Sequence, residues 1–143
     1  MAVEHATADQ QRESLVLEYF KRLDSGGEFL ELFADDARVF YPKWGVAQGR
    51  EEIGELFGDV AEMATAMAHD YEYFNYVTDG STVVVEGTST GEAHDGTEWG
   101  PDGSPGGGRW CDVFEVEDGE IRRLFIYLDP DYAGNDTERY PWL

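Results

Sequence analysis

The segment Gly108–Phe114 contains the best candidate for acid–base chemistry, the carboxyl group of Asp112. The segment reads as a strand, and a strand sends alternate side chains to one face, so Trp110, Asp112 and Phe114 should lie together. Between two large aromatic rings a carboxyl group loses the solvation of its charged form, and its pKa rises. Such a group is a proton donor near neutral pH, or a stronger base than an exposed aspartate. The segment alone leaves a second arrangement open, in which Asp112 faces solvent and the inward residues are Arg109, Cys111 and Val113.

Histidine and tyrosine side chains are further candidates for the same chemistry. Histidine is a residue type suited to acid–base work, and in a strand over residues 69–77 His69 shares a face with Asn75. A histidine at the start of a strand is also often solvated, and this alternative stays open. Tyr41 could donate a hydrogen bond to a ligand oxygen, or its ring could fill the core with the hydroxyl at the rim. Tyr127, close to the end of the last predicted strand, is a candidate for a pocket rim.

The Gly-rich stretch over residues 94–108 carries acidic and histidine side chains, namely His94, Asp95, Glu98 and Asp102. Their spacing matches no recognised metal motif, and a solvated acidic loop is the simpler interpretation. Long Gly-rich loops in compact domains are often functional, so the part around Trp99 is either a lid or a hairpin tip. We predict neither a metal site nor a cofactor.

Composition limits the class of protein and its partners. With 143 residues, 41% of them hydrophobic, the chain suits one domain over 1–143 that can bury a core. A formal net charge of -21 argues against nucleic acid or an anionic membrane as a partner. The single cysteine, Cys111, excludes an intramolecular disulfide. The start of the chain has no basic region followed by an apolar run, and no stretch is long enough to span a bilayer, so we expect a cytoplasmic protein.

Helical periodicity occupies the first half of the chain. It predicts helices over residues 8–24, 28–33 and 49–67, and Ser25-Gly26-Gly27 should end the first of them. Asp35-Asp36 predicts a turn before a short strand over residues 38–41. The apolar stripe of the third helix consists of Ile53, Leu56, Phe57, Val60, Met63 and Ala64.

In the second half of the chain, apolar and polar residues alternate. This alternation predicts four strands, with Asp79-Gly80 and Asp118-Gly119 as hairpin turns and an irregular tail from about residue 129. The strands cover residues 69–77, 82–93, 109–117 and 121–128. Helices followed by an antiparallel meander indicate an α+β domain, whose sheet must curl over the helices and leave a cone open at one end. A cavity in such a cone is a natural small-molecule site. Trp44 would either roof its mouth or pack under the second long helix.

Three runs resemble the nuclear transport factor 2-like superfamily: residues 18–27 (EYFKRLDSGG), 32–39 (LFADDARV) and 49–53 (GREEI). The hairpin over residues 112–121 fits the same pattern. This superfamily includes ketosteroid isomerase, SnoaL-like polyketide cyclases and limonene-epoxide hydrolase. The resemblance implies a cone-shaped α+β barrel, with N-terminal helices packed in a strongly curved, mostly antiparallel sheet. It also implies a homodimer, because sheets of this superfamily commonly pair face to face.

The resemblance gives two residues a place in the site. Tyr19 and Asp112 match the oxyanion-hole tyrosine and the protonated aspartate of the isomerase. Both could donate hydrogen bonds to one ligand oxygen, or a Tyr–Asp hydrogen bond could merely satisfy two buried groups. The isomerase has its general-base aspartate where this chain has Tyr41, so steroid isomerisation by that mechanism is disfavoured. Ser89 stands where the cyclases commonly have a histidine.

Taken together, the residues favour a cofactor-free enzyme of the isomerase, cyclase or lyase type that acts on a small, apolar carbonyl compound. Its catalytic groups would be Asp112, Tyr19, Tyr41 and His69. Its pocket would be lined by Trp44, Asn75, Ser89, Trp110, Phe114 and Tyr127. The missing carboxylate base and the missing histidine leave a non-catalytic small-molecule binding module of the same fold as the alternative.

Overall fold

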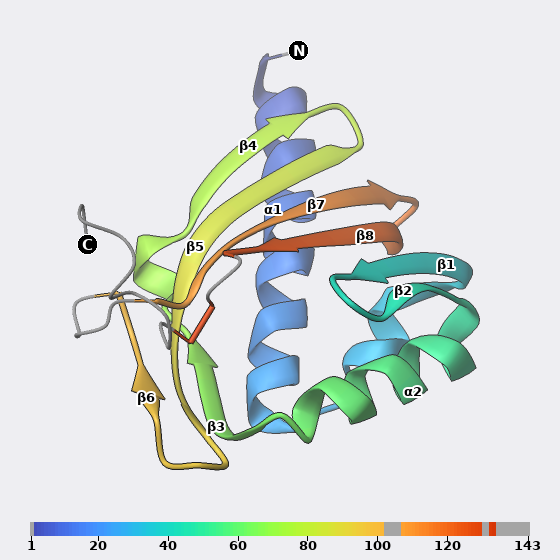
Figure 1. Ribbon diagram of the computed structural model, residues 1–143. Coiled ribbons are helices and arrows are strands. Elements are labelled where there is room, and N and C mark those ends of the chain that lie inside the picture. The colour runs from blue at the N-terminus through green and yellow to red at the C-terminus, as the bar shows by residue number, and fades with distance from the viewer. Residues whose placement is uncertain (1, 102–106, 130–131, 134–143) are drawn as a thin grey trace.

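A strongly curved sheet wraps around the long N-terminal helix, and a second helix closes the lower part of its concave side (Figure 1). The computed structural model describes residues 2–101, 107–129 and 132–133. Their elements, in chain order, are α1 (Ala2–Ser25), a 3-10 helix (Phe29–Leu32), β1 (Phe33–Tyr41), β2 (Gly45–Gln48), α2 (Gly49–Ala61), β3 (Ala64–His69), a second 3-10 helix (Tyr71–Tyr73), β4 (Asn75–Asp79), β5 (Thr82–Ala93), β6 (Glu98–Trp99), β7 (Arg109–Glu117) and β8 (Glu120–Leu128).

Helix α1 forms because its apolar residues recur every three or four positions and face the sheet. Val16, Tyr19 and Phe20 are fully buried on that face. Burial of each such side chain stabilises the fold by about 1.5–3 kcal/mol. The helix ends at Gly26, whose positive φ and the hydrogen bond from the Gly27 N–H to the Arg22 carbonyl (2.7 Å) form a glycine C-cap.

The sheet order is β2-β1-β8-β7-β5-β3, and β4 and β6 also pair with β5. All pairs are antiparallel except β1 with β8, so the sheet is mixed and does not close into a full barrel. The predicted α+β cone is therefore confirmed. The strands over residues 82–93 and 109–117 lie where the alternating pattern predicts them, and Asp118 and Gly119 form the tight turn between β7 and β8 with positive φ at both residues.

Strand β5 bends the sheet. Its first half, Thr82–Glu86, pairs with β4, and its second half, from Ser89 onward, pairs with β3. The concave face of the curve therefore receives side chains from strands that are far apart in the sequence, and this brings the candidate site together.

Several element predictions were wrong. The helix predicted to residue 67 ends at Ala61, and Ala64–His69 is β3, because pairing with the second half of β5 outweighs the local helix preference of this Ala- and Met-rich run. Met63 is 55% exposed rather than part of an apolar stripe. Asp35-Asp36 lies inside β1, not in a turn, and Tyr71–Tyr73 interrupts the predicted strand over residues 69–77. Short β2 and β6 were missed.

The core fills the space between α1 and the concave face of the sheet. Its largest fully buried side chains include Phe33, Phe114, Ile121 and Leu124. No helix among the described residues is long and apolar enough to cross a membrane.

Candidate functional site

A cavity of about 560 Å³ opens on the concave side of the sheet. It lies between α1, the β1–β2 turn, α2, β3, β7 and β8. Aromatic and aliphatic side chains make up most of its wall, among them Phe20, Phe57, Met67, Trp110 and Ile126. The polar groups that line it include Tyr19, Asp24, Tyr41, Lys43, His69, Asp112 and Tyr132. A small-molecule site has this composition, an apolar wall with a few placed polar groups.

Asp112 lies on the buried face of β7 between Trp110 and Phe114, so the predicted arrangement of this face is confirmed. Asp112 is 4% exposed, its Oδ1 is buried, and its carboxyl group has no hydrogen-bond partner among the described residues. Burial raises the pKa of Asp112 well above the usual value for aspartate, since the apolar wall disfavours the charge. The carboxyl group therefore keeps its proton to a higher pH than an exposed aspartate does, and in its protonated form it can donate a proton into the cavity.

Two tyrosines face the same cavity. Tyr19 packs edge-on against Phe20 and Phe114, with ring centroids 4.9 and 5.6 Å away. Burial, and then the charge of Asp112, raises the pKa of Tyr19, and the same two causes raise that of Tyr41 to about 12. Both hydroxyls therefore stay protonated. Within the described part no hydrogen bond joins Tyr19 to Asp112, so the two groups do not satisfy each other.

His69 ends β3 and belongs to a hydrogen-bonded network that the sequence analysis missed. Its Nδ1–H donates to Oδ1 of Asp24 over 2.7 Å, and its backbone N–H donates to Oδ2 over 2.9 Å. The Tyr71 hydroxyl donates to the same Oδ2 over 2.6 Å. The side chains of Asp24 and His69 are each only 9% exposed. In the neutral tautomer that donates Nδ1–H to Asp24, Nε2 of His69 has a lone pair that can accept a proton.

Asp24 accepts all three hydrogen bonds of this network. Burial disfavours its charged form, but the hydrogen bond and charge of His69 and the hydrogen bond from Tyr71 outweigh that cost, and its pKa is lowered. It lies in the last turn of α1, where the helix dipole favours cations rather than an anion. One signal in the sequence could have revealed it: Asp24 continues the buried stripe that runs through Val16 and Phe20 at intervals of four residues.

The site therefore combines an acid, two hydroxyl donors and an oriented imidazole in one apolar cavity. The sequence model of the SnoaL-like domain family matches residues 16–124, which include all four groups. The chain belongs to the SnoaL-like domain family.

Solved structures similar to this SnoaL-like domain share its fold. A candidate polyketide cyclase from Xanthomonas campestris pv. campestris is 17% identical with a TM-score of 0.72, and the alignment covers 85% of this chain and 92% of that one. TerC, crystallised with polyporic acid, is 17% identical with a TM-score of 0.74, over 90% of this chain and 98% of the other. An NTF2-like protein from Anabaena variabilis is 20% identical with a TM-score of 0.71, over 87% and 90%. No curated protein matches this SnoaL-like domain.

Some residues predicted to line the pocket lie elsewhere in this SnoaL-like domain. Asn75 is exposed on the convex face beside Glu86, because the 3-10 turn after His69 breaks the strand alternation. Tyr127 is 49% exposed and faces the same side, next to the ring of Phe40. Phe114 is fully buried in the core behind Tyr19 rather than at the cavity wall.

Ser89 is buried behind the cavity wall, where it positions two aromatic side chains that do line the cavity. Its hydroxyl accepts a hydrogen bond from Nε1 of Trp99 over 3.2 Å and contacts the Tyr132 hydroxyl. Trp99 packs closely on Gly91, where any Cβ would clash with the indole. Trp99 and Tyr132 therefore close one side of the cavity. The part of the 94–108 stretch that carries Trp99 thus forms part of the cavity wall. Trp44, which is 38% exposed, lines the mouth.

No cluster of potential metal ligands occurs among the described residues. Of the four side chains considered as ligands, His94 contacts the Glu62 carbonyl, Asp95 accepts a hydrogen bond from the Thr97 N–H, and Glu98 is exposed. Asp102 lies outside the described residues.

Proposed function

We propose that this SnoaL-like domain binds a small, mostly apolar carbonyl compound and moves a proton at the carbon next to its carbonyl group. The observation that carries this proposal is the carboxyl group of Asp112, buried without a partner in the apolar wall of an open cavity. A buried polar group without a partner costs about 1–3 kcal/mol of stability. A ligand oxygen at this position would satisfy it.

Asp112 acts as the acid in this proposal. It donates to the carbonyl oxygen, and the donation strengthens as that oxygen gains negative charge during enolisation. Tyr19 and Tyr41 line the same cavity with protonated hydroxyls, and they supply further hydrogen bonds to the developing charge. An acid and hydroxyl donors suffice for this step, so it requires no cofactor.

His69 acts as the base. Asp24 holds the proton on Nδ1 and leaves Nε2 to accept a proton from the carbon of the ligand. This pair takes the role of the carboxylate base that is absent before Pro42. The positive imidazolium that forms is stabilised by Asp24, whose lowered pKa keeps it charged. The same groups, used in reverse, return the proton to a different atom, which gives an isomerase, cyclase or lyase according to the ligand.

The comparisons support a small organic ligand. The similar structures include a candidate polyketide cyclase and a protein crystallised with polyporic acid. The cavity volume and its mostly apolar wall, which includes several aromatic side chains, suit a ligand of one to three rings.

The test is deuterium exchange. A panel of cyclic ketones and 1,3-diketones is incubated with the protein in D2O, and deuterium incorporation next to the carbonyl is followed by NMR. Asp112→Asn and His69→Gln should each lower the exchange rate by about 10²–10⁴-fold. Asp118→Asn is the matched control, because it makes the same change in an exposed turn that tolerates Asn. Exchange that survives both cavity variants would contradict the proposed chemistry.

A non-catalytic binding module is the second candidate, and one observation favours it. The strand position before Pro42 holds Tyr41, a hydrogen-bond donor, where an enzyme of this fold could hold a carboxylate base. In that case ligands of the panel bind with an affinity that depends on Asp112, but no deuterium is incorporated.

We also propose that two copies pair through the convex face of the sheet. Cross-strand partners place one apolar row across six strands, which lie side by side in Figure 1: Val77, Val84, Val113, Phe125, Phe40 and Val46. The neighbouring row mixes both charges, with Asp79 and Glu115 opposite in sign to Arg123 and Arg38. A second copy related by a two-fold axis can cover the apolar row and match these charges, since such an interface is self-complementary.

A further inference from the structure

The turn between β1 and β2 holds a lysine in a conformation that favours glycine. The Trp44 N–H donates to the Tyr41 carbonyl over 3.1 Å, with Pro42 and Lys43 between them, and φ of Lys43 is 77°. Glycine is usual at the third position of such a turn, because a side chain disfavours a positive φ. Among the described residues, Asp118 is the only other non-glycine residue with a positive φ, and Asp tolerates this conformation. The position is thus occupied by a residue that the backbone does not favour.

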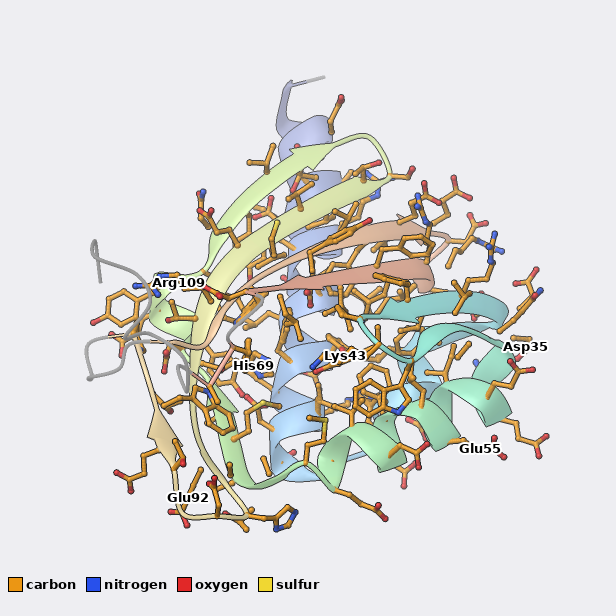
Figure 2. All side chains as sticks on the ribbon, viewed as in Figure 1. Asp35, Lys43, Glu55, His69, Glu92 and Arg109 are labelled. Atoms are coloured by element: carbon orange, nitrogen blue, oxygen red, sulfur yellow. The ribbon has the colours of Figure 1, made fainter. Side chains whose placement is uncertain are left out.

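Lys43 lines the cavity. It is the only Lys or Arg side chain among the described residues that form the cavity wall, in a chain with 31 acidic and 10 basic residues. Figure 2 shows Lys43 reaching from the β1–β2 turn toward the side of the molecule that carries His69. Its ammonium group makes no ion pair within the part of the chain that the structure describes, although carboxylates outnumber basic groups threefold. Lys43 therefore adds to the cavity wall a positive charge that no carboxylate of the described residues pairs with directly.

This charge lies apart from the buried acid. Burial alone accounts for the raised pKa of Asp112, and a neighbouring ammonium would have opposed that rise. Asp112 is 4% exposed, whereas Lys43 is an exposed residue at the mouth. One cavity thus has two polar groups that differ in exposure, a buried carboxyl group and a solvent-exposed ammonium group.

We propose that the ligand of this cavity is a carbonyl or phenolic compound with a carboxylate at its outer end, and that Lys43 binds this carboxylate. The assignment rests on the function proposed above. A single negative charge fits better than a doubly charged group, since the chain carries a formal charge of -21 and Asp24 adds a negative charge to the cavity wall. The oxygen that receives the proton of Asp112 and the carboxylate would lie at opposite ends of the ligand.

Two fluorescent probes test this assignment at 0.15 M salt: 2-naphthol, which has a hydroxyl group only, and 6-hydroxy-2-naphthoate, which adds a carboxylate at the far end of the same rings. The wild-type protein should bind the naphthoate about fivefold more tightly, the effect of a contact worth about 1 kcal/mol near a solvated ammonium. Lys43→Met should reduce the ratio of the two affinities to about one. Lys43→Arg should restore it, and Lys21→Met, which alters an exposed lysine of α1, should preserve it.

The outcomes separate the two proposals. A wild-type protein without preference for the naphthoate, or a Lys43→Met variant that keeps the preference, would overturn the role of Lys43 and leave the proposed function standing. Binding of 2-naphthol that is insensitive to Asp112→Leu would contradict the proposed function. If neither probe binds, both proposals are wrong.

Discussion

Replacement of Asp112 by asparagine should change how the stability of the protein depends on pH. The folded protein holds a proton on Asp112 that the unfolded chain releases at about pH 4, because burial raises the pKa only in the folded state. The contribution of this group to stability is therefore fully present below about pH 4 and is lost as the pH rises through the folded pKa. The amide of the Asp112→Asn variant does not titrate, so the variant would lack this loss.

The expected magnitude follows from linkage. While the carboxyl stays protonated in the folded state, each pH unit above about 4 removes about 1.4 kcal/mol from the stability of the wild-type protein relative to the variant. The difference in the free energy of unfolding should therefore grow in favour of the variant as the pH rises above about 4, until the pH reaches the folded-state pKa of Asp112.

Urea unfolding of both proteins at pH 5, 6 and 7, followed by tryptophan fluorescence, measures this difference. Asp118→Asn is the control, since Asp118 is exposed in the β7–β8 turn and should give the same difference at each pH. A difference between Asp112→Asn and wild type that stays constant from pH 5 to pH 7 would mean that the carboxyl is ionised in the folded state, and the argument for a neutral acid would fail. A carbon NMR titration of the Asp112 carboxyl gives the same answer directly.

Further expectations concern the other parts of the site and the convex face. Asp24 accepts three hydrogen bonds, and Asp24→Asn leaves one of the three donors without an acceptor. The free energy of unfolding should therefore fall by about 1–3 kcal/mol in urea titrations, and the variant should lose deuterium exchange. Unchanged exchange would exclude His69 as an oriented base. Phe125→Glu should convert a dimer to a monomer in light scattering, and high salt should strengthen the wild-type dimer by screening its net charge; a wild-type monomer at every salt concentration would refute face-to-face pairing. Lys43→Gly should raise the stability by about 1 kcal/mol, a shift in Tm of about 2–4 °C, by relieving the positive φ; a fall in Tm would show that the turn is not strained.

The strands of the second half could be predicted because their signals are local. β5 and β7 combine alternating patterns with Gly-containing turns, and this alternation limits the inward face of β7 to two sets of residues, between which the family resemblance favours the set that contains Asp112. β3 could not be predicted in this way. Its Ala- and Met-rich sequence favours a helix, and only pairing with β5, which lies about 25 residues later, makes it a strand.

The candidate site also has residues that could be predicted from the sequence and residues that only the fold brings together. Asp112, Tyr19, Tyr41 and His69 were found from strand alternation and from a family resemblance, and all four line the cavity. Asp24 was missed because its partners His69 and Tyr71 lie more than 40 residues further along the chain and become neighbours only in the fold. Asn75 and Tyr127 were misplaced because a 3-10 turn and the curvature of the sheet decide which face a strand presents.

The parallel pairing of β1 with β8 also has a consequence for the order in which the cavity forms during folding. The β7–β8 hairpin has a two-residue turn and can form early, whereas β1 must wait for the last strand of the sheet before it can pair. Loop-closure entropy makes this the costly step of folding. The β1–β2 turn that carries Lys43 follows β1 directly and lines the same cavity as Asp112. On the ribosome, a nascent chain that lacks β8 would therefore lack part of the cavity wall, and we expect ligand binding only after β8 has been synthesised.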